Sequence, residues 1–103
     1  MDVVFHGHNA VISERMQERA MRGLSKLSRR MERPIDATVR FHQDGPSRRV
    51  EIRLNSSGQR DLVAAGEARY YGPALKIALA HLESQVGHAR RAPKEKWQRS
   101  GRA

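Results

Sequence analysis

The chain has 103 residues, which is enough for one small domain with a modest core and too few for two. Its 20 lysines and arginines outnumber 11 acidic residues and give a net charge of +9, so nucleic acid is the expected partner, ahead of an anionic membrane or an acidic protein. The absence of cysteine excludes disulfides and thiolate metal sites, and no apolar run could cross a membrane, so we expect a soluble, cytoplasmic protein.

The first third of the chain predicts a short strand and then a helix. Residues 3–5 are β-branched or aromatic and stand just before Gly7, so they favour a strand. Ser13 is a good N-cap residue, and Glu14 lies in the first turn, where the helix dipole favours an acid. We expect Pro34 to end this helix, because the residue before a proline is pushed out of helical geometry.

Two alternating segments in the middle of the chain predict a β-hairpin. Residues 36–42 and 48–54 each place apolar side chains on one face and polar side chains on the other. The residues between them, QDGPS, are a turn by composition. After a further turn at 55–58, residues 60–66 predict a weaker third strand.

The last third predicts a second helix and a tail. Pro73 fits the first turn of a helix in which apolar residues recur at helical spacing, namely Leu75, Ala78, Leu79, Leu82 and Val86. No periodicity follows Pro93. We therefore expect one domain over residues 1–92 and a disordered basic tail over residues 93–103.

These elements have the order β-α-β-β-β-α, which is typical of the α+β fold class. Because the strands are apolar on one face only, we expect two layers: a four-stranded antiparallel sheet with two helices on one face. The other face of the sheet should stay exposed to solvent.

The charges of the first helix are sorted by side. At 100° per residue, its apolar residues form one stripe, while Arg15, Arg19, Arg22, Lys26, Arg29 and Arg33 form a second stripe about 120° away, which we call the basic ridge. Glu14, Glu18 and Glu32 occupy a third sector. A solvated helix would intersperse the two signs, so this segregation favours phosphate binding over a merely soluble surface.

The second helix predicts another wall for a basic groove. His81, Ser84, His88 and Arg91 share one sector of it, and that sector should face the first helix. The candidate RNA-binding residues are therefore Arg15, Arg19, Arg22, Lys26, Arg29, Arg30, Arg33, His81, His88, Arg90 and Arg91.

The element order, together with three segments, resembles the family of ribosome hibernation promoting factor and ribosome-associated inhibitor A. The segments are LSKLSRR at 24–30, LVAAG at 62–66 and HLESQVGHARR at 81–91. The resemblance implies a protein that binds the decoding side of the small ribosomal subunit through two basic helices and silences idle ribosomes. It implies no cofactor, no small-molecule substrate and a monomer off the ribosome.

Some positions depart from the family pattern. His81 and Ser84 stand where lysine and arginine are usual, and Arg69 stands where an acid is usual before the second helix. The chain ends near residue 103, so it resembles a short form, without the domain by which long members pair ribosomes. Trp97 in the tail could stack on a base.

Three alternatives stay open at the level of sequence. A generic double-stranded RNA-binding module has the same order without the first strand and reads RNA by shape. A basic structural protein of a large acidic assembly would also explain the charge. A metal site at His6 and His8, joined by Asp2 or His42, is the weakest alternative, and no nucleophile or nucleotide-binding motif indicates an enzyme.

Overall fold

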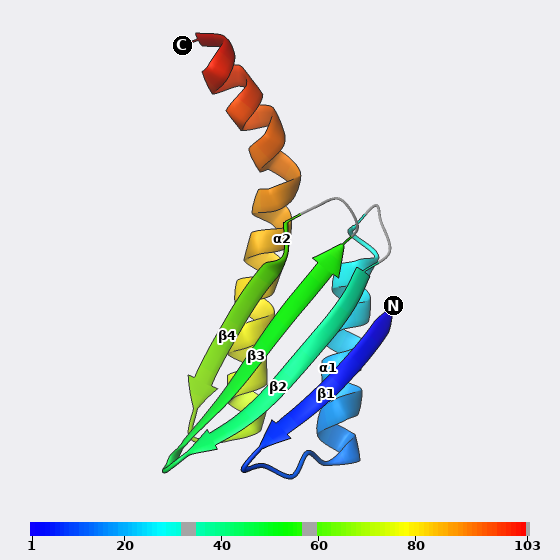
Figure 1. The fold of residues 1–103 in the computed structure, drawn as a ribbon, viewed down its shortest axis with the longest axis vertical. Coiled ribbons are helices and arrows are strands. Elements are labelled where there is room, and N and C mark those ends of the chain that lie inside the picture. Colours follow the sequence, from blue (N-terminus) through cyan, green and yellow to red (C-terminus); the bar gives the residue numbers. More distant parts are fainter. Residues whose placement is uncertain (32–34, 57–59, 103) are drawn as a thin grey trace.

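The computed structural model describes residues 1–31, 35–56 and 60–102, with side chains to residue 87 apart from residue 35. Four strands and two helices follow one another in the predicted order β-α-β-β-β-α (Figure 1). Their bounds are β1 (Asp2–His8), α1 (Glu14–Ser28), β2 (Ile35–Asp44), β3 (Ser47–Ser56), β4 (Leu62–Ala68) and α2 (Tyr71–Arg102). The predicted α+β fold class is confirmed.

The four strands form one sheet in the order β1-β2-β3-β4. The hairpin β2–β3 is antiparallel, with Phe41 opposite Val50, and β4 is antiparallel to β3. The prediction of a wholly antiparallel sheet is wrong at one border, because β1 is parallel to β2, with Val3 opposite Ala37. The reason is the connection: α1 crosses over between these strands and returns the chain to the end of the sheet where β1 begins (Figure 1).

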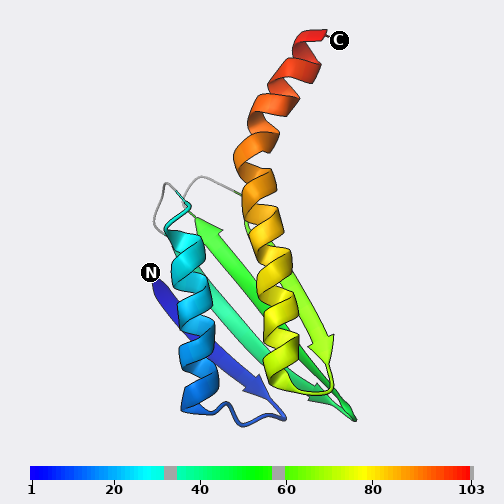
Figure 2. The same ribbon diagram turned by 180° about the vertical axis from the view of Figure 1, so that it is seen from behind.

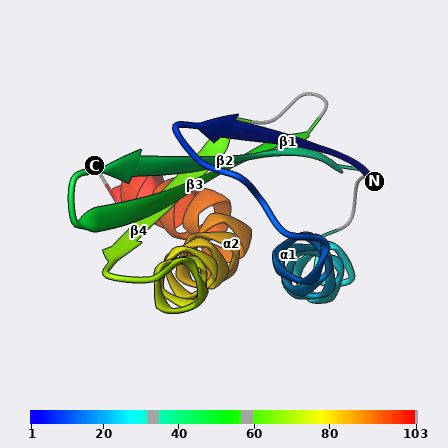
Figure 3. The ribbon, with the colours of Figure 1, turned by 90° about the horizontal axis from the view of Figure 1, so that it is seen from below.

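The core lies between the sheet and the two helices, which cover the same face (Figure 3). Alternate residues of β2 and β3 point into it, and so do one stripe of α1 and one stripe of α2. Leu27 is only 5% exposed, which confirms the predicted phase of α1. The buried residues are Ala20, Leu24, Leu27, Ala37, Val39, Phe41, Val50, Ile52, Leu54, Ala64, Ala74, Leu75, Ala78, Leu82 and Val86.

Helix α1 begins as predicted and ends early. The side-chain oxygen of Ser13 accepts a hydrogen bond from the backbone N–H of Met16 at 3.1 Å, which is an N-cap. At the other end, the N–H groups of Arg30 and Met31 donate to carbonyls three residues back, at 3.0 and 3.1 Å. These tight turns end the helix at Ser28, before the predicted limit at Pro34, which lies outside the described residues.

Helix α2 runs past the predicted limit of the domain. It continues through Pro93 to Arg102, and its last turns extend beyond the sheet (Figures 1 and 2). A proline inside a helix removes one backbone hydrogen bond, and for this reason Pro93 predicts a helix end. Residues 94–99, KEKWQR, are nevertheless mostly good helix formers. The expected disordered tail is therefore a helix in this structure, while the domain division at residue 92 stays a prediction.

Two glycines allow α2 to pack closely, one against α1 and one against β4. A Cβ atom on Gly23 of α1 would lie 2.6 Å from Cδ1 of Leu79, so this glycine sets the spacing between the two helices. A Cβ atom on Gly66 of β4 would overlap the carbonyl oxygen of Ala74 and lie 2.6 Å from the backbone nitrogen of Ala78. Helix α2 therefore packs directly on the backbone of β4.

Candidate nucleic-acid interface

The basic ridge lies on the outer side of α1. The described members of the ridge, Arg15, Arg19, Arg22, Lys26 and Arg29, are all exposed. None of them forms an ion pair with another described residue of the chain. The apolar stripe of the same helix is buried against the sheet, which leaves it unavailable to a membrane surface. The ridge thus presents free positive charge from a helix that the core holds in place.

The acids of α1 lie on its other flank, toward β1. Glu14 and Glu18 line a shallow hollow together with Phe5 and Met21. The acids of α1 therefore lie apart from most of the basic ridge, and Arg22 is the ridge cation that also lines this hollow. Because like charges on neighbouring turns repel each other, sorting of this kind favours an external anion that meets the ridge.

The seam between the helices contains one ion pair. Nη1 of Arg30, just after α1, lies 3.0 Å from Oε1 of Glu83 on α2, and both side chains are largely exposed. At the other end of the seam, Nη1 of Arg19 lies 3.2 Å from the position of a Cβ atom on Gly72. Arg19 and Arg30 therefore extend the ridge toward α2, and Glu83 neutralises one of them.

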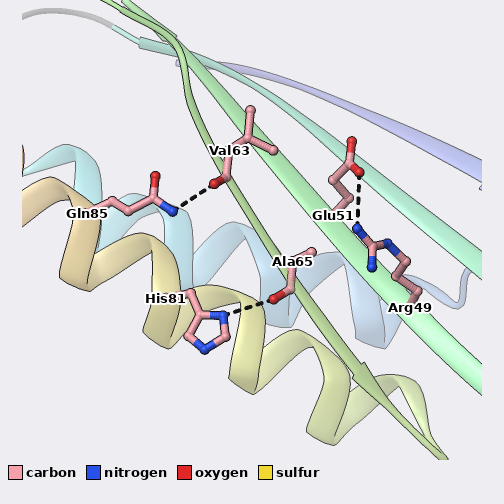
Figure 4. Close-up of polar contacts among 6 residues, drawn as sticks. All are labelled: Arg49, Glu51, Val63, Ala65, His81 and Gln85. Carbon is pink, nitrogen blue, oxygen red and sulfur yellow. Dashed lines mark hydrogen bonds and ion pairs between the residues drawn. The ribbon is translucent and has the colours of Figure 1, made fainter.

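His81 is not part of the predicted groove wall. Its Nδ1 lies 3.0 Å from the carbonyl oxygen of Ala65 in β4, and Nε2 of Gln85 donates to the carbonyl oxygen of Val63 at 2.7 Å (Figure 4). A carbonyl only accepts, so the imidazole donates from Nδ1. The helical wheel shows which residues of α2 share a side, but it does not show which side of α2 faces α1. Glu83, two residues and therefore 200° away from His81, lies on the side of α2 that faces α1, as Leu79 does.

Four other candidates cannot be placed. Arg33 lies outside the described residues, and the side chains of His88, Arg90 and Arg91 lie outside them too, although their backbone belongs to α2. Their role in binding stays a prediction.

The open face of the sheet does not share the positive excess. Its strands place three cations there, Arg40, Arg49 and Arg53, against five carboxylates, those of Asp2, Asp36, Asp44, Glu51 and Glu67. Arg49 pairs with Glu51 at 3.8 Å (Figure 4), and Arg53 pairs with Asp61 at 4.0 Å. The longest run of unpaired cations in the described chain thus lies on α1.

The histidines of the sheet do not form a metal centre in the described part of the chain. The rings of His8 and His42 stack with their centroids 4.7 Å apart and their planes at 9°. No group of three or more potential ligands gathers among the residues that the structure describes. Within the same residues, no helix is long and apolar enough to span a membrane.

A comparison with protein families completes this geometry. The family described as sigma 54 modulation protein / S30EA ribosomal protein matches residues 3–93. This chain belongs to that family. Its members are ribosome-associated modulation factors, and the family description names no catalytic activity. The resemblance that the sequence shows to hibernation factors is confirmed.

Solved structures show that this S30EA-family protein shares its fold with two relatives. The N-terminal domain of Protein Y from Thermus thermophilus is similar with a TM-score of 0.76 and 24% sequence identity, over 84% of this chain and 96% of that one. A ribosomal subunit interface protein from Coxiella burnetii is similar with a TM-score of 0.75 and 18% identity, over 87% and 98%. No curated protein sequence matches the chain.

Proposed function

We propose that this S30EA-family protein is a translation inhibitor of the cytoplasm that binds small-subunit ribosomal RNA at the decoding region and silences idle ribosomes. Its membership of a ribosome-associated family supports a ribosomal partner. The observation that carries the assignment to RNA is the basic ridge, whose described cations are exposed and unpaired within the described chain. The ridge is the part of the described surface that a phosphate backbone would favour most.

The geometry of the ridge suits RNA read by shape. Residues 15–29 of a helix rise by about 21 Å, so their cations can follow several consecutive phosphates. The helix is fixed by buried Leu24 and Leu27, so the backbone that carries the cations is already ordered before they bind. Arg15, Arg19, Arg22, Lys26 and Arg29 are the proposed contacts, with Arg30 available when it leaves Glu83.

A charge reversal on the ridge tests this proposal. Lys26→Glu with Arg29→Glu should strongly weaken co-sedimentation with purified small ribosomal subunits and leave the melting temperature nearly unchanged, because both side chains are exposed. The matched control is Arg60→Glu with Arg69→Glu, two exposed cations that belong neither to α1 nor to the proposed contacts and that give the same change in net charge. The control should bind like the natural chain.

Two results would contradict the proposal. Equal loss in both double variants would mean that only net charge matters, as expected for a basic structural protein. Equal affinity of the natural chain for a plain RNA duplex of about 16 base pairs would favour a generic double-stranded RNA-binding module instead.

A further inference from the structure

The two borders of the sheet are finished in different ways. At the β4 border, side chains of α2 close the edge: Gln85 donates to the carbonyl of Val63 and His81 donates to that of Ala65 (Figure 4). At the other border, β1 has no strand on its outer side, and both helices lie in the layer behind (Figures 1 and 3). Within the described residues, no side chain hydrogen-bonds to the backbone of β1.

An open border strand of this kind can accept another strand. The seven residues of β1 extend over about 23 Å, and half of their N–H and C=O groups point away from β2. A peptide that pairs with this edge would obtain main-chain hydrogen bonds, and side-chain contacts on either side would decide which peptide fits.

The surface beside this edge is apolar and acidic. On the helix side, the hollow between β1 and α1 is lined by Phe5 and by Met21, which is 37% exposed, with Glu14 and Glu18 at its rim. On the open side of the sheet, Val4 is 50% exposed. Arg22 is the one cation that lines the hollow, and neither glutamate forms an ion pair with another described residue.

The charge of this strip decides between possible occupants. In a chain of net charge +9, two free carboxylates beside an open edge repel RNA phosphate and attract cations. A second copy of the chain fits poorly, since its β1, DVVFHGH, contains no lysine or arginine to meet Glu14 and Glu18. The complementary occupant is an extended segment of another protein in which lysine or arginine alternates with apolar residues.

We propose that the outer edge of β1, with the acidic and apolar flank of α1, is a docking strip for an extended cationic segment of a partner protein. The segment adds a fifth strand to the sheet. Because side chains alternate along a strand, its cations lie on the helix side, where they meet Glu14 and Glu18, and its apolar residues lie on the open side beside Val4. This strip lies on the side of α1 away from α2, so the partner and the RNA contact largely different surfaces, which meet at Arg22. The inference does not depend on RNA binding.

A synthetic peptide tests the strip. The probe is a ten-residue peptide of alternating lysine and valine. Its binding is measured from the changes that it causes in the amide NMR shifts of the full chain. We expect shifts in β1 and in residues 14–22 of α1. A peptide methylated on every backbone nitrogen keeps its charge but donates no main-chain hydrogen bond, and should bind roughly tenfold more weakly or not at all.

Variants of the chain supply the second part of the test. Glu14→Gln with Glu18→Gln should weaken the peptide roughly three- to tenfold. The control Asp36→Asn with Glu67→Gln removes two carboxylates from the open face and should leave the affinity unchanged. Three results would contradict the docking strip. They are equal binding of the methylated peptide, NMR shifts confined to the open face of the sheet, and equal weakening by both double variants. Self-association through β1, or shifts of β1 caused by RNA, would overturn the choice of occupant.

Discussion

Among the described side chains of the helix layer, Arg30 is a cation whose charge is balanced by an acid of the same chain. Its guanidinium lies 3.0 Å from the carboxylate of Glu83, and the two residues are 53 positions apart in the chain. Both side chains are exposed, at 42% and 63%, so the pair contributes little to stability. Glu83 is thus better understood as an acid inside the proposed RNA surface, where it competes with phosphate for Arg30.

Removal of this acid should strengthen binding. In Glu83→Gln, Arg30 is free to meet phosphate and a repulsive charge is lost, so we expect roughly two- to fivefold tighter binding to small ribosomal subunits. Titration of the subunits with labelled protein measures the change, and Glu67→Gln on the open face of the sheet is the control. Weaker binding in Glu83→Gln would show instead that the pair positions Arg30 for RNA.

At the scale of the elements, sequence patterns predicted most of the fold. Period-two alternation located β2 and β3, and the Ser13 cap and the apolar stripe fixed the start and the phase of α1. The side of α2 that faces α1 could not be predicted, because it depends on where the helix lies across the sheet. The close approach at Gly66 places α2 along β4, and this turns His81 toward the edge of that strand.

The closure of the β4 edge gives an element-scale prediction. Gln85→Ala leaves the carbonyl of Val63 without its side-chain donor, so we expect a loss of about 0.5–1.5 kcal/mol in the free energy of unfolding and faster amide hydrogen exchange in β4. Chemical denaturation and exchange measured by mass spectrometry check both effects. Ser84→Ala, at an exposed neighbouring position, is the matched control and should change neither. If the two variants behave alike, the bond from Gln85 does not stabilise the edge.

The whole molecule separates its charges by layer. The open face of the sheet carries slightly more carboxylates than cations, and two of its arginines are ion-paired, whereas the described ridge of α1 is unpaired. Composition alone shows the excess of +9 but not its position, because that requires the strand register. This asymmetry gives the domain one side for a polyanion and leaves β1 and its flank for a different kind of partner.

The asymmetry predicts how binding responds to salt. If the five described ridge cations each neutralise one phosphate, the logarithm of the association constant should fall with the logarithm of salt concentration with a slope of roughly −4. Between about 50 and 200 mM salt, affinity for small ribosomal subunits should therefore fall by roughly two orders of magnitude. The slope of Lys26→Glu with Arg29→Glu should be smaller by roughly two, while that of Arg60→Glu with Arg69→Glu should match the natural chain. A flat dependence would mean that apolar or uncharged polar contacts hold the complex, and the ridge would then not be the interface.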